Sequence, residues 1–396
     1  AMGVQHVIAM FGATVLAPIL MGFDPNLAIF MSGVGTLLFY FITGGQVPSY
    51  LGSSFAFIGV VIAATGYGGQ GPNANLPVAL GAIIVCGLLY ALIGALVNAV
   101  GTRWIERLMP PVVTGAVVAV IGLNLAAIPV KNMAASNFDS WMQLVTFVSV
   151  ALVAVFARGM VQRLLILVGL AIASVIYVLL ANGLGLGKPM DFSGIASAAW
   201  VGLPRFTAPE FSGNAMLLIA PVALILVAEN LGHLKAVAAM TGRNLDPYIG
   251  RAFTADGVAT MISGAAGGTG VTTYAENIGV MAATRIYSTA VFVVAALMAL
   301  VLGFSPKFGA LIQAIPLPVM GGVSIVVFGL ITIAGARIWV DNKVDFSNPA
   351  NLLTAAITLI LGTGDFTLKF GSFALGGIGT ATFGAVLLHA LLRRRA

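Results

Sequence analysis

Residues 267–285, GGTGVTTYAENIGVMAATR, decide how this chain folds. They lie within a long apolar sequence and combine a Gly-rich opening, a β-branched run and a new helical pattern that begins near Glu276. We predict a short extended segment that leads into a half-helix. A helix that begins inside a bilayer leaves its first backbone N–H groups unpaired, and these groups suit a polar ligand.

The carboxylate of Glu276 stands at the same place. A carboxylate at membrane depth is costly unless it faces a polar site, so we expect Glu276 to contact the ligand. The alternative is that Glu276 caps the N-terminus of its own helix.

The composition places the chain in a membrane. Of its 396 residues, 60% are hydrophobic and 8% are charged, and the mean hydropathy is +1.07. A soluble domain of this length could not cover so much apolar surface, so we predict a polytopic membrane protein. The chain begins on an apolar pattern without a basic region or cleavage site before it, so we expect no signal peptide. The single cysteine, Cys86, excludes a disulfide framework within the chain.

Clusters of Gly, Pro, Asn and charged residues divide the chain into fourteen apolar spans. Their approximate limits are residues 3–21, 26–43, 50–66, 76–101, 107–128, 139–157, 161–183, 213–235, 246–264, 269–285, 287–304, 309–335, 348–363 and 372–392. Thirteen Lys and Arg residues lie in the loops of one side and at the C-terminus, and five lie on the other side. By the positive-inside rule, both termini are cytoplasmic. Because the net charge of +6 follows the membrane, we expect no nucleic-acid partner.

The two halves of the chain resemble each other. Residues 110–123, PPVVTGAVVAVIGL, read like residues 316–330, PLPVMGGVSIVVFGL, and residues 53–57, SSFAF, parallel residues 272–276, TTYAE. These matches lie seven spans apart, and an odd number of spans inverts the second copy. We therefore predict an all-α membrane protein of two inverted seven-span halves, in which short extended segments break spans 3 and 10 at a central binding site. The alternative is a chance match between apolar segments.

Four groups of ionisable residues lie inside the predicted spans: His6, Glu229 with His233, Asp256, and Glu276. Glu229 and His233 are four residues apart, so a helix places them on one face. A carboxylate–imidazole pair in hydrocarbon is typical of a proton relay, although it can also be a structural pair that joins two helices. We expect His6 to be a satisfied core residue unless it faces Glu229, and Asp256 to accept a helix-packing hydrogen bond.

The expected ligand is small, flat and uncharged, as a nucleobase is. Two carboxylates accept hydrogen bonds, helix starts donate them, and Phe55 and Tyr274 offer aromatic faces. An anion transporter of this architecture would need a Lys or Arg near the breaks, which the sequence lacks. An intramembrane enzyme would need a nucleophile, for which only Ser53 and Ser54 are available. No metal-ligand spacing and no Walker-type Lys is present, so we expect no metal and no cofactor, and transport driven by an ion gradient.

At these residues the chain resembles the nucleobase–cation symporter 2 family, also called the nucleobase–ascorbate transporters. The family signature is an acidic or amide residue followed by N-x-G and then by Thr and a basic residue, and residues 276–285, ENIGVMAATR, match it. The Gln5-His6 pair is also present. Further matches, chiefly to uracil permeases of the family, are FGATVLAPIL, VPSYLGSSFAF, GTRWIERLMPPVVTGAVVAVIGLNLA, ILVAENLGHLKAVA and IPLPVMGGVS. Together they extend over nearly the whole chain.

The resemblance implies a core domain and a gate domain. The core domain would comprise residues 1–104 (spans 1–4) and 213–305 (spans 8–11), and the gate domain residues 105–212 (spans 5–7 with a connector) and 306–396 (spans 12–14). It also implies homodimers formed through the gate domains and an elevator-like movement of the core. The expected location is the bacterial inner membrane.

The resemblance also implies the binding residues. The base would be held by Glu229 and Glu276, by backbone at Phe55 and Ala275, and with help from His233. We therefore expect a proton-coupled importer of uracil and related pyrimidines, with Glu229 and His233 coupling the proton. Transport of xanthine, other purines or thymine, and coupling to Na⁺, stay open as alternatives.

Two positions depart from the pattern of uracil permeases. Ala275 replaces the Gly that is common before the signature Glu, and Phe328 stands where a Tyr is common on the gate. Because the contact expected at residue 275 is made by the backbone, Ala275 in place of Gly is compatible with this contact. The missing hydroxyl of the possible gate residue Phe328 leaves the substrate range less defined.

Overall fold

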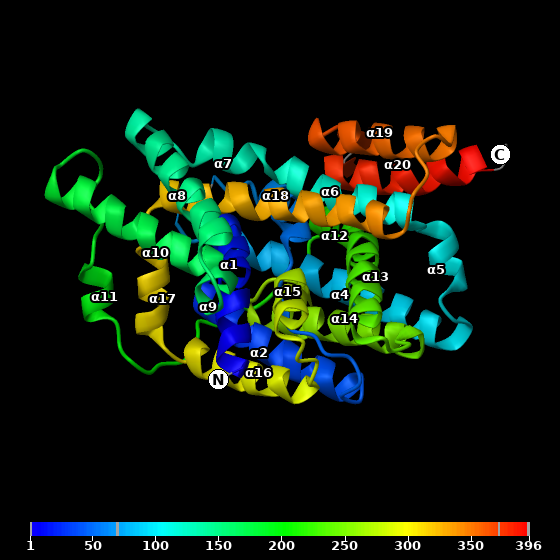
Figure 1. The fold of residues 1–396 in the computed structure, drawn as a ribbon, viewed down its shortest axis with the longest axis horizontal. Coiled ribbons are helices and arrows are strands. Elements are labelled where there is room, and N and C mark those ends of the chain that lie inside the picture. The colour runs from blue at the N-terminus through cyan, green and yellow to red at the C-terminus, as the bar shows by residue number, and fades with distance from the viewer. Residues whose placement is uncertain (1, 69–70, 371–372, 394–396) are drawn as a thin grey trace.

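Figure 1 shows a chain built mainly of helices, and two short strands from its two halves pair with each other. The computed structural model describes residues 2–68, 71–370 and 373–393. Strands β1 (Leu51–Ser53) and β2 (Val271–Thr273) pair antiparallel, with Gly52 opposite Thr272. All six strand residues are buried, so the ladder pairs backbone groups that lipid could not satisfy.

Each strand leads directly into a helical segment. After β1 the chain forms the 3₁₀ turn η1 (Phe55–Phe57) and helix α3 (Ile58–Thr65). The side chain of Ser54 begins this turn by accepting a hydrogen bond from Ala56 N at 3.2 Å. After β2 the chain forms α15 (Ala275–Thr284), which has Glu276 in its first turn. The turn η1 begins at the buried Phe55, whereas α15 begins at Ala275, which is exposed and directly follows the buried Tyr274.

A first group of helices packs around the two strands. It consists of α1 (Met2–Met21), α2 (Pro25–Ile42), α4 (Leu76–Val100), α12 (Gly213–Ile219), α13 (Val222–Thr241), η3 (Asp246–Tyr248), α14 (Ile249–Ala266) and α16 (Thr289–Gly303). The closest helix pair is α4 with α14. A Cβ on Gly257 of α14 would lie 2.4 Å from the backbone N of Ala91 in α4, so only glycine allows this approach.

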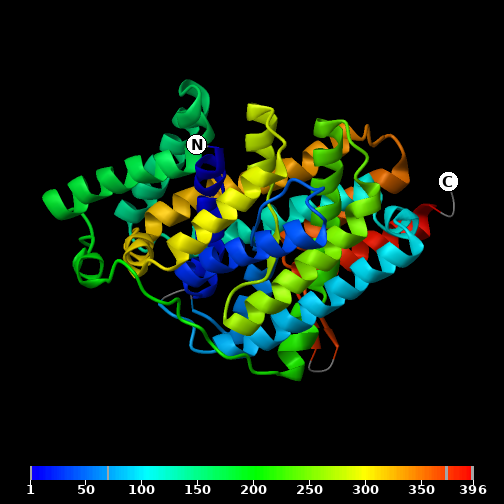
Figure 2. The same cartoon turned by 90° about the horizontal axis from the view of Figure 1, so that it is seen from below.

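A second group lies along the other edge of the molecule, where Figure 1 shows α6, α18, α19 and α20 together. Its long helices are α6 (Pro111–Leu125), α8 (Asn137–Phe156), α10 (Leu165–Val178), α18 (Leu317–Asp341), α19 (Pro349–Thr363) and α20 (Gly377–Leu392). Shorter elements connect them, namely α5 (Arg103–Leu108), α7 (Ala127–Asn132), α9 (Met160–Arg163), the π-helix η2 (Leu179–Gly183), α11 (Ser193–Ser197), α17 (Pro306–Gln313) and the hairpin of β3 (Leu368–Phe370) and β4 (Phe373–Leu375). In Figure 2 the segment that follows α10 runs along the lower edge of the molecule to α12.

The described part of the chain contains eight helices that are long and apolar enough to cross a membrane, or nine if α16 and α17 form one span bent by 84°. Several predicted span limits differ from the helices. The predicted ends at 235 and 335 are too early, because α13 extends to Thr241 and α18 to Asp341, and the predicted start at 372 is replaced by Gly377 in α20. The predicted span 309–335 begins at Leu317, because Pro316 and Pro318 separate α18 from the short α17. The predicted span 107–128 begins at Pro111, and Arg107 belongs to the separate helix α5.

Gly52 allows the ring of Tyr274 to pack against β1. A Cβ at this position would lie 2.5 Å from the ring of Tyr274 and 2.7 Å from Thr14 Oγ1. We expect Gly52→Ala to destabilise the protein by about 1–3 kcal/mol, as overpacking of a filled core does. The check is the melting temperature in detergent. The matched variant Gly329→Ala, for which no atom lies within 4 Å of the added Cβ, should melt as the native protein does, and an equal loss in both variants would contradict this explanation.

Candidate functional site

A cavity of about 390 Å³ lies where the two strands turn into their helices. Its volume is in the range of pockets that hold small organic ligands. Six residues predicted from the sequence line this one cavity: Phe55, Glu229, His233, Tyr274, Ala275 and Glu276. They come from η1, α13 and α15, so the strand pair brings together segments more than 200 residues apart in the chain.

The remaining lining consists of four hydroxyl residues of the strand segments, namely Ser53, Ser54, Thr272 and Thr273, and of apolar residues from both helix groups. Ile8 and Ala9 of α1 belong to the first group. The second group contributes Val118 of α6, residues 164–167 at the start of α10, and Leu330, Ile331 and Ala334 of α18. Among the described residues that line the cavity there is no Lys or Arg. A ligand in this cavity would therefore touch both groups and meet acidic but no permanently basic side chains.

The two carboxylates differ in their surroundings. Glu229 Oε2 is buried and has no hydrogen-bond partner among the described residues, so it is a free acceptor. The Glu276 carboxylate lies in the first turn of α15, where the partial positive charge of the helix N-terminus favours an acidic side chain. Capping and ligand binding are compatible, because a carboxylate has more than one acceptor position.

Hydrogen bonds behind the cavity assign the tautomer of His233. The Thr273 hydroxyl donates to Asn230 Oδ1 at 3.3 Å, and His233 Nδ1 lies 2.9 Å from Thr273 Oγ1. Because a hydroxyl has a single proton, His233 Nδ1 is the donor in the second contact. In the neutral ring Nε2 then keeps a lone pair. Since His233 lines the cavity, this nitrogen is a hydrogen-bond acceptor for the ligand in addition to Glu229 Oε2.

A buried cluster of polar side chains contacts Thr273 through Asn230. Asn230 Nδ2 donates to Asp256 Oδ2 at 2.7 Å and to the hydroxyl of Tyr90 at 2.8 Å. The prediction that Asp256 accepts a helix-packing hydrogen bond is confirmed. Asn230, Tyr90 and Thr273 were not predicted from the sequence as parts of the site. The hydroxyl group of Tyr90 in the middle of the apolar helix α4 was a signal that could have indicated a buried polar contact.

His6 lies away from Glu229. Its ring packs against Phe292 with centroids 4.6 Å apart, and Asn277 Nδ2 is 3.0 Å from its Nδ1 and donates to its backbone oxygen at 3.1 Å. His6 is thus a buried core residue that joins α1 to α15, but it is not fully satisfied as expected, because its Nε2 has no hydrogen-bond partner among the described residues.

A hydrogen bond positions the ring of Tyr274, and a ring contact positions that of Phe55. The Tyr274 hydroxyl donates to Ser53 O at 2.9 Å, which holds its ring against β1. Phe328 does not line the cavity but packs edge-on against Phe55, with ring centroids 5.8 Å apart. Phe328 thus supports a wall residue from the second helix group.

No group of three or more His, Cys, Asp or Glu side chains within the described residues could hold a metal ion.

A family model described as "Permease family" matches residues 1–370. The chain belongs to this permease family, the nucleobase–ascorbate transporters. It is accordingly a transport protein and not an enzyme.

Similar permeases align over almost the whole chain. "Putative pyrimidine permease RutG" of Escherichia coli (strain K12) is 70% identical over 394 residues, which cover 100% of this chain and 89% of that protein. "Uracil permease" of Paenibacillus larvae is 42% identical and covers 98% of this chain and 92% of that protein. "Uracil permease" of Escherichia coli (strain K12) is 38% identical and covers 99% and 90%.

Solved transporters share the fold of this permease at low sequence identity. The transmembrane domain of the cyanobacterial bicarbonate transporter BicA has a TM-score of 0.67 and 15% identity, with 91% of this chain and 94% of that chain covered. SLC26A9 has a TM-score of 0.69 and 12% identity, and the match covers 99% of this chain and 64% of that longer chain.

Proposed function

We propose that this permease imports uracil and related pyrimidines together with protons. The observation that carries the proposal is the cavity in which Glu229, Glu276 and His233 meet two helix starts inside apolar walls. Similar proteins named uracil permeases support the choice of base.

The proposed contacts follow from the chemistry of uracil, which is flat and uncharged and alternates N–H donors with C=O acceptors. Glu276 and Glu229 accept from its N–H groups, and backbone N–H groups at Phe55 and Ala275 donate to its oxygens. His233 Nε2 offers a further acceptor. Phe55 and Tyr274 flank the ring.

Proton coupling is assigned to Glu229 and His233. They lie one turn apart on α13, and both line the cavity. Glu229 has a carboxylate oxygen without a partner among the described residues, so a proton at this oxygen would change how it meets the ligand. No cofactor is required besides the proton gradient.

The transport movement is proposed to be of the elevator type. Residues 1–104 and 213–305 would form the moving core and residues 105–212 and 306–396 the gate, and the packing of the helices into two groups supports this division. Fourteen spans in two inverted halves would require α3, α14, α15, α19 and α20 to count as spans in addition to the nine given above. We further propose homodimers through the gate domains and both termini on the cytoplasmic side of a bacterial inner membrane.

Anion transport is the function named for some proteins of similar fold. In this chain two carboxylates line the cavity, and its described lining contains no Lys or Arg. Two like charges would repel an anion, so a neutral ligand fits better.

The test is uptake of labelled uracil into proteoliposomes that contain the purified permease, with and without an inward proton gradient. We expect uptake that depends on the gradient and that unlabelled uracil and pyrimidine analogues inhibit. Inhibition by xanthine or other purines but not by pyrimidines would reject the proposed substrate. Gradient-independent accumulation would reject the coupling.

Thr273→Val tests the assigned orientation of His233. The variant keeps the side-chain shape but removes the acceptor of the His233 Nδ1 proton. The variant also removes the donor to Asn230 Oδ1. Of the two lost hydrogen bonds, the one to His233 should account for a loss of uracil affinity of about 2- to 12-fold, measured by equilibrium binding. The matched variant Thr358→Val, whose hydroxyl donates to Thr354 O of its own helix, should bind as the native protein does. Native affinity in Thr273→Val would contradict the assigned role.

A further inference from the structure

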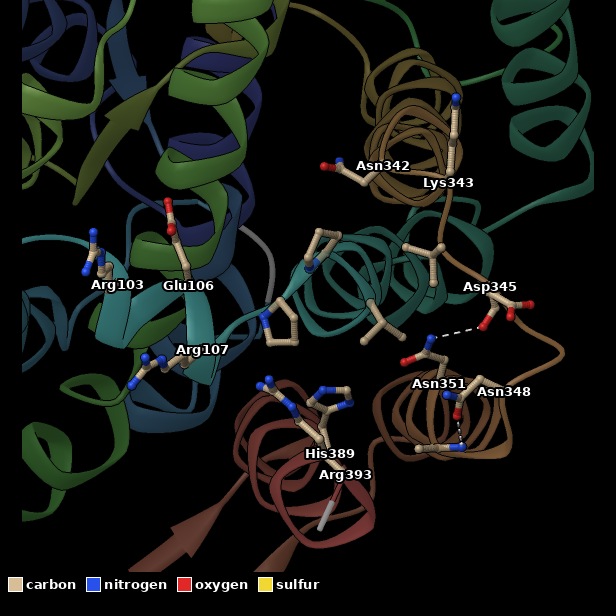
Figure 3. Close-up of a pocket in the computed structure, with 15 residues that line it drawn as sticks. Arg103, Glu106, Arg107, Asn342, Lys343, Asp345, Asn348, Asn351, His389 and Arg393 are labelled. Atoms are coloured by element: carbon tan, nitrogen blue, oxygen red, sulfur yellow. Dashed lines mark hydrogen bonds between the residues drawn. The ribbon is translucent and has the colours of Figure 1, made fainter. Parts of the chain in front are cut away.

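A second cavity of about 610 Å³ opens at the end of the molecule that carries the C-terminus (Figure 3). Its walls come from α5, the ends of α18 and α20, and the starts of α6 and α19. It shares no lining residue with the cavity of Glu229 and Glu276. None of the roles proposed above uses it.

Positive charge dominates this cavity. Arg103 and Arg107 line it from α5, Lys343 from the loop after α18, and Arg393 from the end of α20. Among the described residues, none of these four side chains forms an ion pair. In Figure 3 Arg393 lies beside His389, whereas Lys343, Arg103 and Arg107 extend away from His389, so we assign these three side chains to the rim. Three guanidinium groups therefore stand free at the cavity.

The two acidic residues of the lining already have partners. Glu106 Oε1 lies 3.0 Å from Lys235 Nζ, which also contacts Asp246 at 2.8 Å. The hydroxyl and backbone N–H of Ser347 donate to Asp345 Oδ1 at 2.6 and 2.8 Å and hold the pKa of this carboxyl below its ordinary value. Neither carboxylate neutralises the three arginines directly.

Two helix starts add to the positive potential. Pro111 begins α6 and Pro349 begins α19, and residues of both first turns line the cavity. Each of these helices has 15 residues, so its N-terminal end presents partial positive charge to the cavity.

An independent sign of a ligand comes from His389. Its side chain is only 8% exposed, it lines the cavity, and its Nδ1 has no hydrogen-bond partner among the described residues. A buried imidazole nitrogen without a partner is costly, and an anionic oxygen in the cavity would satisfy it. Figure 3 shows His389 beside Arg393, between the arginines of α5 and the asparagines of α19.

We infer that this cavity binds a phosphate group, held by Arg393 and His389 beside the start of α6, while Arg103 and Arg107 add positive charge from α5. The start of α19 adds only its dipole, because the N–H of Ala350 already donates to Asn348 Oδ1 at 2.8 Å. Guanidinium groups pair with phosphate oxygens through two parallel hydrogen bonds, which favours phosphate over a simple halide. The phosphate is carried either by a soluble phosphate ester or by the headgroup of an anionic phospholipid. Because α5 connects α4 with α6, the bound phosphate would tie the two helix groups together at this end.

The experiment measures binding to the full-length purified permease and does not depend on which base it transports. One arm titrates glycerol 3-phosphate and inorganic phosphate, which carry no nucleobase, onto the protein in a neutral detergent at constant ionic strength, and follows its melting temperature. The other arm compares nanodiscs of phosphatidylcholine with nanodiscs that also contain phosphatidylglycerol. Arg393→Ala should weaken binding of the active probe about 10-fold or more, and Arg107→Ala by a smaller factor.

Arg337→Ala is the matched control, because it removes an arginine of α18 that is exposed and does not line the cavity. His389→Gln keeps a hydrogen-bond donor and should retain part of the affinity if a site variant fails to fold. Stabilisation by the soluble probes identifies a phosphate ester as the source, and stabilisation only in phosphatidylglycerol nanodiscs identifies a lipid headgroup. No stabilisation by any probe, or an equal loss in Arg393→Ala and Arg337→Ala, would overturn the inference.

Discussion

Glu276→Ala should abolish equilibrium binding of uracil to the purified permease. Glu276 lies in the first turn of α15 and lines the cavity with an acceptor that no neutral side chain replaces. A hydrogen bond to a charged group contributes about 1.5–3 kcal/mol, and a ligand N–H left unpaired costs about 1–3 kcal/mol more. The expected loss of affinity is therefore roughly 100-fold or more.

The measurement is titration calorimetry in detergent, with Glu210→Ala as the matched control. Glu210 is an exposed carboxylate of the segment between α10 and α12 and does not line the cavity. Its variant should bind uracil as the native protein does. Native affinity in Glu276→Ala would remove this residue from the binding site and leave it as a helix cap alone.

Glu229→Gln should uncouple uracil uptake from the proton gradient. The amide keeps the shape of the side chain but cannot gain or lose a proton near neutral pH. We expect exchange of uracil across the proteoliposome membrane to persist, while accumulation driven by an inward proton gradient falls to the level without a gradient.

The readout separates coupling from binding, because uptake is compared at equal internal and external pH and with a gradient. Glu210→Gln makes the same chemical change outside the cavity and should stay coupled. Full gradient-driven accumulation by Glu229→Gln would assign the proton to another group, with His233 as the next one to test.

Local sequence signals predicted much of the site. The spacing of Glu229 and His233 placed them one turn apart, and both line the same cavity in α13. The Gly-rich and β-branched runs before Glu276 favoured extended backbone and then a helix, and β2 and α15 occupy that stretch. Such signals are visible because backbone propensity and helical period depend on neighbours in the sequence.

Other parts of the site depend on packing between distant segments. Val118 and Leu330 are ordinary apolar residues of long helices, and only the approach of the second helix group makes them walls of the cavity. The cluster of Tyr90, Asn230 and Asp256 joins three helices, and no spacing in the chain links these residues. His389 is buried beside a charged cavity formed by five elements, and no local pattern in the sequence indicates this position.

The pairing of β1 with β2 also has a consequence for how the protein is made. Thr273 is synthesised 222 residues after its partner Leu51 (273 − 51), which takes about 10–45 s at typical rates of 5–20 residues per second. During this time the edge of β1 lacks the neighbour that satisfies its backbone in the finished protein. Insertion of the early helices and completion of the central ladder are therefore separate events in biogenesis, and a nascent chain halted before β2 would display an open strand to the chaperones and proteases of the membrane.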